Sequence, residues 1–274
     1  MPELPEVETV RSGLEKNLIG KRITAAKKLH PRALRSDSLA PLSSIKGSKI
    51  KAVNRRGKFL WLEFDRPEVL VAHLGMSGQF KIQSAKSVAE PHLRARFQLS
   101  NGKELRFVDQ RTFGWLCIDE LEGDVPTVVS HIARDLFDPK FNKREAIEAI
   151  SKKRTQIKKA ILDQNILSGI GNIYADEALW RAKIHPERSA NELSFQEIAN
   201  LISEAKKVMV RALAAGGTSF DELYINVNGE SGYFERSLAV YGREGEPCRR
   251  CGSEILRIAF ANRSSRLCPA CQTR

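Results

Sequence analysis

The chain has 274 residues, in which 45 lysines and arginines stand against 33 aspartates and glutamates, a formal net charge of +12. This length suffices for two domains with a buried core, and the excess of positive charge favours a polyanionic partner. No apolar run approaches the roughly 20 residues of a membrane-spanning helix, and the acidic N-terminal stretch differs from the positively charged start of a secretory signal. We therefore expect a cytoplasmic protein with no membrane contact.

The first eight residues, Met-Pro-Glu-Leu-Pro-Glu-Val-Glu, predict the start of a helix. Pro5 suits the first helical position, where no backbone N–H is needed, and the glutamates that follow it would lie near the positive end of the helix dipole. Apolar residues continue at helical spacing until Gly20, which is typical of a helix end. A helix does not account for Pro2 and Glu3.

Residues 22–118 predict a series of short strands. The run Lys58–Phe64 is apolar and aromatic, and Asn101-Gly102 between two strand-like segments is a strong signal for a hairpin. Short strands separated by turns are typical of a β-sandwich or barrel. Cys117 belongs to this pattern, which predicts a buried thiol in the core.

A change of pattern near Val125-Pro126 and Asp138-Pro139 predicts a linker, and helical periodicity follows it. The clearest helix is predicted to begin at Ser194, which would form a capping box with Glu197. We expect its apolar stripe to face the core: Phe195, Ile198, Leu201, Ile202, Ala205, Met209 and Leu213. Residues 216–236 are rich in glycine and lack a clear period, which predicts a long loop.

The segment Gly169-Ile-Gly-Asn172 predicts a tight turn before a helix that starts at Asn172. The free N–H groups at that helix end could bind a phosphate, although a glycine pair in this position is more often an ordinary turn. Basic residues just upstream favour the phosphate interpretation: Lys152, Lys153, Arg154, Lys158 and Lys159.

Four of the five cysteines form the pattern Cys248-x2-Cys251, sixteen residues, Cys268-x2-Cys271. This spacing is typical of a four-cysteine zinc site in which two knuckles flank a hairpin, and a disulfide framework is not expected in the cytoplasm. Four thiolates fill a tetrahedral ion and leave no position for a water. We therefore expect one structural Zn²⁺ per chain, whose hairpin presents arginines to an anion.

Pro2 is a candidate nucleophile. When the initiator methionine is removed, as is common before a small residue, Pro2 becomes a free secondary amine that can condense with an aldehyde-level carbon to give a cationic imine. Lys58, which follows Gly57 at a predicted strand end, could supply a cation that favours the free amine. Glu3 would be the adjacent proton-transfer group.

With these residues in view, the whole chain resembles the formamidopyrimidine-DNA glycosylase family, the bacterial enzymes that repair oxidised purines. The motifs that carry the resemblance, in chain order, are Pro2-Glu-Leu-Pro-Glu6, Gly57-Lys58, His73-Leu-Gly-Met-Ser-Gly78, Asp109-Gln-Arg-Thr-Phe-Gly114, Gly171-Asn-Ile-Tyr174, Val240-Tyr-Gly-Arg243 and the four cysteines. Several motifs in one order are far more specific than any one of them.

The resemblance implies an α+β multidomain fold. Residues 1–130 would form a catalytic β-sandwich domain with an N-terminal helix, residues 131–240 a helix–two-turn–helix domain that binds DNA, and residues 241–274 a zinc-finger β-hairpin. It also implies a monomer whose partner is double-stranded DNA with damaged bases, bound in the cleft between the domains.

The resemblance further implies a bifunctional DNA glycosylase and abasic-site lyase that excises 8-oxoguanine and formamidopyrimidines. Pro2 would attack C1′ of the damaged nucleotide, expel the base and form a Schiff base, with Glu3 as acid–base partner. Lys58 would then assist β-elimination, and Arg263 on the zinc hairpin δ-elimination, which leaves a gap flanked by phosphates.

The expected DNA contacts also follow from the resemblance. Met76, Arg111 and Phe113 resemble the trio inserted where the lesion is flipped out, although the strand pattern alone would place Met76 and Phe113 in the core. Asp221 lies in the loop on the lesion side and bears on lesion preference. The remaining expected contacts are His73, His92, Lys153, Lys158, Asn172 and Tyr241.

Two alternatives stay open on the sequence. A pyrimidine-preferring relative of the endonuclease VIII type would share the fold, but Leu4 and the set Met76, Arg111 and Phe113 argue against it. A non-catalytic DNA-binding protein would need phosphate contacts but neither an N-terminal amine nor a proton-transfer group, so the retention of Pro2 together with Glu3 and Lys58 argues for an enzyme.

Overall fold

The computed structural model describes residues 2–217 and 234–274, except for the side chains of residues 235 and 236. Most of the predicted loop 216–236, including Asp221, lies outside the described residues. The chain divides into two compact units: unit 1 comprises Met1–His131 and Ala215–Tyr233, and unit 2 comprises Ile132–Ala214 and Phe234–Arg274. In the described parts of both units, no helix is long and apolar enough to cross a membrane.

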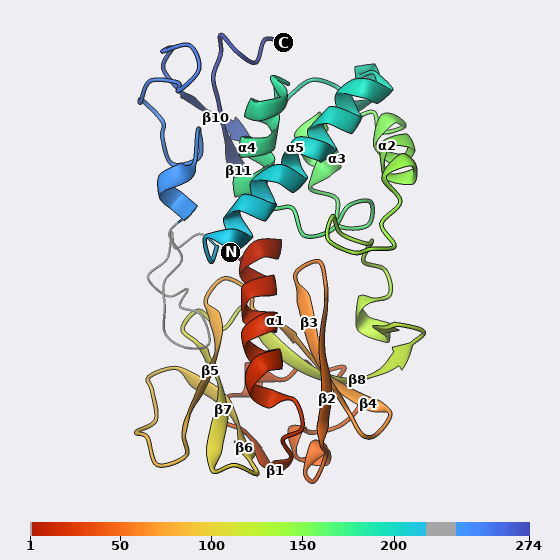
Figure 1. The fold of residues 1–274 in the computed structure, drawn as a ribbon, viewed down its shortest axis with the longest axis vertical. Coiled ribbons are helices and arrows are strands. Elements are labelled where there is room, and N and C mark those ends of the chain that lie inside the picture. Colours follow the sequence, from red (N-terminus) through yellow and green to blue (C-terminus); the bar gives the residue numbers. More distant parts are fainter. Residues whose placement is uncertain (1, 218–233) are drawn as a thin grey trace. The chain divides into compact units, whose positions relative to one another are not determined.

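Unit 1 contains two antiparallel sheets and one long helix (Figure 1). The four-stranded sheet, in the order β1-β6-β7-β5, is built from β1 (Ile23–Lys28), β5 (Gly78–Ser84), β6 (Leu93–Leu99) and β7 (Lys103–Asp109). The five-stranded sheet, in the order β2-β3-β4-β8-β9, is built from β2 (Ile50–Arg56), β3 (Phe59–Phe64), β4 (Glu68–His73), β8 (Trp115–Glu122) and β9 (Val125–Pro126). Short 3₁₀ helices connect these elements at Pro31–Ala33, Leu42–Ile45 and Thr127–Val129. The expected β-sandwich with an N-terminal helix is confirmed.

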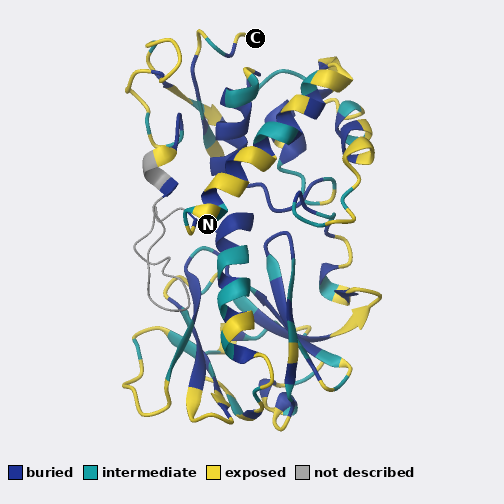
Figure 2. Cartoon of the chain, viewed as in Figure 1, coloured by how far each residue is buried: buried dark blue, intermediate teal, exposed yellow. Residues whose placement is uncertain are grey.

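The two sheets and α1 (Leu4–Leu18) share one hydrophobic core. One face of α1 contributes Val7, Val10, Leu14 and Leu18 to this core, and alternate residues of the central strands complete it. Figure 2 shows the buried residues along these strands. Each fully buried side chain of this kind contributes roughly 1.5–3 kcal/mol to folding, so the apolar pattern alone accounts for the packing of helix on sheet.

Local sequence signals explain where the elements turn. Gly102 has φ +76° and closes the β6–β7 hairpin at the predicted Asn101-Gly102 turn. The helix α1 begins one residue before Pro5, and Gly20, with φ +79°, follows its end. The predicted linker begins later than expected: Val125-Pro126 pair with the end of β8 as the edge strand β9, and the two units divide after His131, between this pair and Asp138-Pro139.

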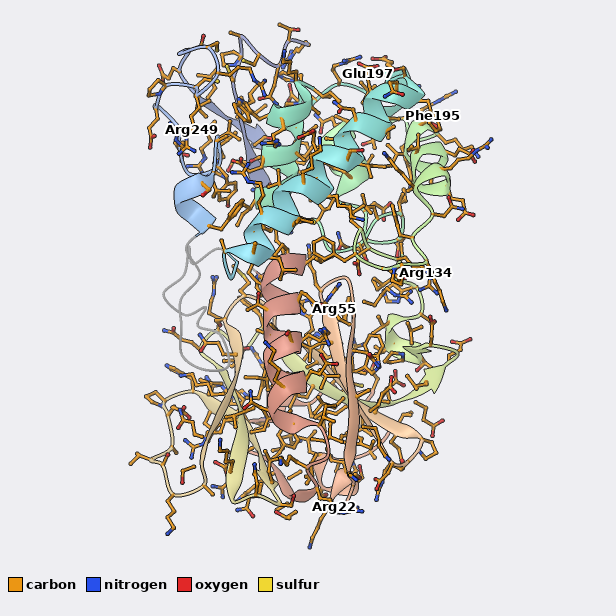
Figure 3. The ribbon with its side chains drawn as sticks, viewed as in Figure 1. Arg22, Arg55, Arg134, Phe195, Glu197 and Arg249 are labelled. Carbon is orange, nitrogen blue, oxygen red and sulfur yellow. The ribbon has the colours of Figure 1, made fainter. Side chains whose placement is uncertain are left out.

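Unit 2 is helical and ends in a two-stranded hairpin. Its elements are α2 (Lys143–Ser151), α3 (Ile157–Ile161), α4 (Asn172–Ala182), α5 (Phe195–Ala214), β10 (Leu256–Phe260) and β11 (Arg263–Leu267), with 3₁₀ helices at Ala190–Glu192 and Phe234–Ser237. The capping box is present, since Ser194 N–H donates to Glu197 at 2.8 Å and Glu197 N–H donates to the Ser194 hydroxyl at 3.2 Å. The core prediction is wrong for Phe195, which is 54% exposed because it stands at the first residue of α5 with few neighbours (Figure 3).

Candidate active site and nucleic-acid interface

The N-terminal residues of unit 1 are buried rather than frayed. Pro2 is buried, and Glu3, which caps the N-terminus of α1, is 2% exposed. The Glu3 N–H donates to the Glu6 carboxylate at 2.9 Å. Gly217 packs close to Glu6, since a Cβ at Gly217 would lie only 3.2 Å from the Glu6 side chain. The cap therefore fixes a carboxylate directly beside Pro2.

Lys58 lies at the turn between β2 and β3, and it is 8% exposed. Gly57 makes this turn with φ +56°, and the Arg55 guanidinium donates to the Gly57 carbonyl at 3.1 Å. Arg55, which is labelled in Figure 3, also forms an ion pair with Glu8 of α1, with Nε and the carboxylate oxygen 2.8 Å apart.

The register of α1 on β2 shows which end of the helix meets this turn. Arg11 of α1 donates to the carbonyl of Val53 at 3.1 Å, and Glu8, one turn earlier, pairs with Arg55, two residues later. The helix and the strand thus run in opposite directions, so the start of α1 is directed toward the turn that carries Lys58. The structure brings Pro2, Glu3 and Lys58 to the same end of unit 1.

His73 lies at the end of β4, between Phe59 of β3 and Trp115 of β8. Its ring is 4.9 Å from the Phe59 ring and 5.8 Å from the Trp115 ring, centroid to centroid. Burial, and secondarily the charge of Lys58, lowers the pKa of His73 to about 4. His73 is therefore neutral at neutral pH, and its Nδ1 accepts the Gly75 N–H at 3.1 Å.

Two loops that carry candidate DNA contacts are joined by one buried carboxylate, Asp109. Its oxygens accept the Ser77 hydroxyl at 2.5 Å, the Arg111 N–H at 3.2 Å and the Gly114 N–H at 2.7 Å. Gly75 has φ +61°, and a Cβ there would lie 2.4 Å from the nitrogen of Gly114, so only glycine permits this approach of the two backbones.

The tips of these loops point away from the core. Phe113 is 55% exposed, Arg111 is exposed, and the Arg111 guanidinium lies 5.3 Å from the Phe113 ring centroid. Met76 on the other loop is half-buried. The alternative that Phe113 belongs to the core is excluded, and the arrangement presents an apolar wedge beside a cation. His92 is exposed, with φ +66° and its Nδ1 3.3 Å from the Arg94 guanidinium.

In unit 2, the basic run upstream of the glycine turn is mostly exposed. Lys152, Lys153, Arg154 and Lys159 are exposed, and the Lys153 ammonium lies 3.2 Å from the Asp163 carboxylate. The predicted helix start at Asn172 is confirmed. Its side-chain Nδ2 donates to the Ser264 carbonyl of the hairpin at 3.1 Å, and its buried Oδ1 has no hydrogen-bond partner among the described residues.

Lys158 departs from this run because it is fully buried. Its ammonium lies 2.6 Å from the carboxylate of Asp176 on α4 and donates to the hydroxyl of Ser265 on β11 at 3.0 Å. Asp176 also accepts the Ser265 hydroxyl at 2.9 Å and the Arg266 N–H at 3.0 Å. The expected contact of Lys158 with DNA is at odds with this burial, since the ammonium is enclosed and already paired. Lys158 instead joins α3 and α4 to the hairpin that carries Arg263.

A second buried carboxylate, Glu177, holds the segment before the zinc knuckle. It accepts the N–H groups of Ala239, Val240 and Tyr241 at 3.0, 2.8 and 3.0 Å on one oxygen. Burial raises the pKa of this carboxyl, and the three N–H groups oppose that rise. The ring of Tyr241 is half-buried under the Arg266 guanidinium, 4.3 Å from the ring centroid.

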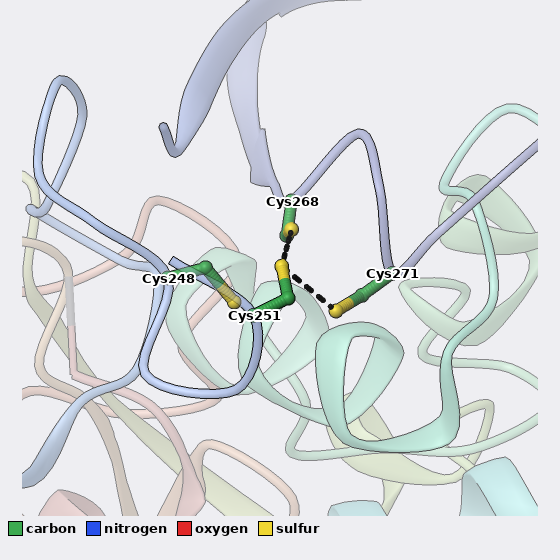
Figure 4. Close-up of side chains that lie close together, drawn as sticks. All are labelled: Cys248, Cys251, Cys268 and Cys271. Carbon is green, nitrogen blue, oxygen red and sulfur yellow. Dashed lines mark hydrogen bonds between the residues drawn. The ribbon is translucent and has the colours of Figure 1, made fainter. Parts of the chain in front are cut away.

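Four cysteine sulfurs, those of Cys248, Cys251, Cys268 and Cys271, converge at the base of the hairpin (Figure 4). All four lie within 4.8 Å of one another, and Cys251 is 3.4 Å from Cys268 and 3.5 Å from Cys271. Zinc–thiolate bonds of about 2.3 Å in a tetrahedron separate the sulfurs by about 3.8 Å, so the set fits one such ion. Cys117 lies in β8 and is not part of this cluster.

The sequence predicts no role for Asp109, although this residue opens one of the motifs that carry the family resemblance, and it does not single out Asp176 or Glu177. A carboxylate has the same local pattern whether it is solvated or buried. The sequence did contain one signal for the last two, because they are adjacent acids in the otherwise uncharged and mostly apolar run from Ile173 to Trp180, which the structure buries completely. Arg263 is exposed on unit 2, whereas Pro2, Glu3 and Lys58 belong to unit 1.

Comparison with protein families gives three matches in chain order. Residues 1–116 match the formamidopyrimidine-DNA glycosylase N-terminal domain, residues 132–222 the formamidopyrimidine-DNA glycosylase H2TH domain, and residues 245–274 a zinc finger found in FPG and IleRS.

Individual proteins match over nearly the full length. The formamidopyrimidine-DNA glycosylase of Acidothermus cellulolyticus is 54% identical over 276 residues, covering 99% of this chain and 97% of that protein. That of a Nocardioides species is 51% identical over 278 residues, covering 99% and 94%. A Lactococcus lactis FPG mutant solved with Fapy-dG containing DNA superimposes with a TM-score of 0.88 at 32% identity, covering 100% of both chains. MutM solved with carbocyclic 8-oxo-G containing DNA gives 0.86 at 33%, again over 100% of both.

Proposed function

The chain belongs to the formamidopyrimidine-DNA glycosylase family, and we propose that it excises oxidised purines from double-stranded DNA and then cleaves the strand at the abasic site. Within the structure, one observation supports this most directly: Pro2 and Glu3 are buried together at the start of α1, which is directed toward Lys58. A DNA-binding protein without chemistry has no need of this group. The relatives solved with Fapy-dG and 8-oxo-G DNA favour purine lesions as substrates.

The proposed first step is a displacement at C1′ of the damaged nucleotide. With Met1 removed, the Pro2 nitrogen forms a bond to C1′ while the bond from C1′ to the base breaks, and the base leaves with the bonding electrons and takes a proton from water. The proton that Pro2 loses passes through Glu3 to the ring oxygen of the sugar as the ring opens to a cationic imine. Glu3 suits this transfer because its position is fixed by the helix cap, directly beside the amine.

The cationic imine then withdraws electrons from the neighbouring bonds, which makes the C2′ proton acidic. Loss of a proton from C2′ expels the 3′ phosphate, which is β-elimination, and a second elimination expels the 5′ phosphate. We assign Lys58 to the first elimination, because it is held at the turn toward which α1 starts. The assignment of Arg263 to the second rests on the family resemblance alone.

Extrusion of the lesion costs a few kcal/mol of stacking and pairing, and a protein can offset this with inserted side chains. We propose that Phe113, Arg111 and Met76 fill the space that the nucleotide leaves. The support is that Phe113 and Arg111 are exposed on a loop whose backbone is fixed by Asp109.

We assign phosphate contacts to His92, Lys153, Asn172 and Tyr241, and place His73 at the edge of the substrate site. The start of α4 offers backbone N–H groups and a positive dipole to a phosphate. We further propose that the four cysteines hold one Zn²⁺, which fixes the ends of the hairpin and takes no part in the chemistry.

Borohydride trapping tests the proposed nucleophile. If Pro2 forms an imine, reduction during turnover of an 8-oxoguanine duplex should give a stable protein–DNA crosslink that maps to the N-terminal peptide. Pro2→Gly keeps an amine, a primary one, and should retain reduced trapping, whereas acetylation of the terminus or retention of Met1 should abolish it. A crosslink on Lys58 would refute the assignment.

Two comparisons separate the alternatives. Glu3→Gln should suppress base excision far more than cleavage of a preformed abasic site, while DNA binding survives. Faster trapping on an oxidised-pyrimidine duplex than on the 8-oxoguanine duplex would instead favour a pyrimidine-preferring enzyme of the endonuclease VIII type.

A further inference from the structure

Unit 2 carries a hollow on its α2–α5 face that the proposed function does not use. Its volume is about 770 Å³, within the range of ligand sites. Leu136, Phe141, Ile202 and Val210 supply its apolar lining. Val210, a large apolar residue near the C-terminal end of α5, is 48% exposed there. An apolar surface of this kind favours a ligand that brings an apolar group of its own.

Apart from Ser203, the remaining lining is cationic. Lys143, Arg181, Lys206, Lys207 and Arg211 border the hollow, and no carboxylate does. Arg181 and Lys207 share the nearby Glu204, at 2.6 and 2.7 Å.

The other three cations are not neutralised. Lys143 donates only to the hydroxyl of Ser203, at 2.7 Å, and Lys206 and Arg211 form no ion pair with any residue that the structure describes. The hollow therefore combines an apolar floor with uncompensated positive charge.

The spacing along α5 sets the shape of a fitting ligand. Ile202, Lys206 and Val210 are four residues apart and lie on one face of the helix, so apolar and cationic groups alternate along it. From Lys206 to Arg211 the helix rises about 7.5 Å, and Lys143 adds a charge from α2. One small carboxylate cannot reach charges spread over two helices, whereas an extended chain with several carboxylates can. The phosphate backbone of duplex DNA would satisfy the cations, but the bases are stacked inside the duplex and the backbone presents no apolar side chain to the floor.

We propose that this hollow docks an acidic segment of a partner protein, with a leucine or phenylalanine in the hollow and flanking aspartates and glutamates on the cations. A labelled peptide tests this directly. The probe is fluorescein-labelled Asp-Glu-Asp-Leu-Phe-Asp-Glu-Leu, measured by fluorescence anisotropy with the full-length protein. We expect saturable binding in the micromolar range. Two control peptides, one with serine in place of leucine and phenylalanine and one with lysine in place of the acids, should each bind at least tenfold more weakly.

Variants locate the binding on the protein. Val210→Asp and Lys206→Glu should each weaken peptide binding at least tenfold. Phe195→Asp, an exposed apolar residue of the same helix, and Arg144→Glu, an exposed cation of α2, lie outside the lining and should leave it unchanged. Unchanged circular dichroism and lesion-DNA affinity would show that the variants are folded.

Several results would overturn the proposal. One is an anisotropy signal that does not saturate up to about 1 mM peptide. Another is equal affinity for the serine peptide, and a third is a loss of peptide affinity in the two control variants equal to that in Val210→Asp and Lys206→Glu. If Lys206→Glu and Val210→Asp instead weakened DNA binding and spared the peptide, the hollow would be a nucleic-acid contact.

Discussion

In unit 1, the loops that carry Met76 and Arg111 are held by close glycine contacts and by N–H groups bonded to one carboxylate, Asp109. In unit 2, the hairpin that carries Arg263 is held by the buried ammonium of Lys158 and by its partner Asp176. The four cysteines lie at the base of the same hairpin. The first arrangement fixes the backbone of the loops and leaves the side chains of Arg111 and Phe113 exposed. The second arrangement buries the charged groups themselves, the ammonium of Lys158 and the carboxylate of Asp176, in the interior of unit 2.

The difference bears on what each unit tolerates. Exposed tips such as Phe113 contribute little to folding, so their side chains are available for DNA at small cost to stability. A buried charge that loses its partner is strongly destabilising. The residues that position Arg263 should therefore be inseparable from the folding of unit 2, whereas the wedge residues of unit 1 should be separable from folding.

The largest effect should come from removal of the metal. Cys268→Ala, or chelation, should release the hairpin, because structural zinc sites contribute on the order of 10 kcal/mol to local folding. We expect loss of the bound zinc and at least a hundredfold weaker binding of lesion DNA. The matched control is Cys117→Ala, which should retain one equivalent of zinc by metal analysis. A loss of zinc in that control would contradict the assignment of the four ligands.

Breaking the buried pair should come next. Asp176→Asn leaves the Lys158 ammonium buried without its counter-charge and should lower the free energy of unfolding by about 3–5 kcal/mol. The double change Lys158→Met with Asp176→Leu should recover much of that loss, because apolar replacement of a buried pair is often neutral. Glu148→Gln, which breaks the exposed pair with Arg144, should cost at most about 1 kcal/mol in the same urea titration. Equal losses in the free energy of unfolding for Asp176→Asn and Glu148→Gln would show that burial of the ion pair does not determine the cost of breaking it.

The pH dependence of unit 1 should show the neutral state of His73. Its pKa is about 4 in the folded chain and about 6.5 when unfolded, so below pH 6.5 the unfolded chain binds the proton first. The contribution of neutral His73 to the free energy of unfolding is fully present above pH 6.5. It is lost as the pH falls toward 4, by about 3 kcal/mol at most. His73→Gln should flatten this part of the stability curve relative to the unchanged chain. An identical slope in both proteins would show that His73 is not held neutral.

The smallest effect on folding is expected at the wedge. Phe113→Ala should change the free energy of unfolding by no more than about 0.5 kcal/mol, since the ring is more than half exposed. Excision of 8-oxoguanine from duplex DNA should nevertheless fall at least tenfold, with cleavage of single-stranded abasic DNA less affected. A destabilisation comparable to that of Asp176→Asn would place Phe113 in the core after all.

Local signals predicted much of this fold. The Asn101-Gly102 hairpin, the start of α4 at Asn172 and the capping box at Ser194 each depend on residues within a few positions, and the structure contains all of them. The four cysteines are equally readable, because zinc ligands come in short pairs.

Long-range contacts account for what the sequence did not predict. Lys158 stands in a basic run, and nothing nearby shows that Ser265, 107 positions away, and Asp176 enclose it. Phe113 is likewise exposed, and it directly follows the left-handed Thr112, whose φ is +54°. Strand propensity alone would have placed this ring inside.

The carboxylate of Glu177 has a consequence for the loop before the zinc knuckle. Three consecutive N–H groups that converge on one point form a nest, the backbone concavity with which many proteins capture phosphate. Here the nest already contains a carboxyl group that belongs to the chain itself, that of Glu177. These three amides already donate to Glu177, so they are not available to phosphate or sulfate from solution. Any contact that Tyr241 makes with DNA therefore has to come from its side chain.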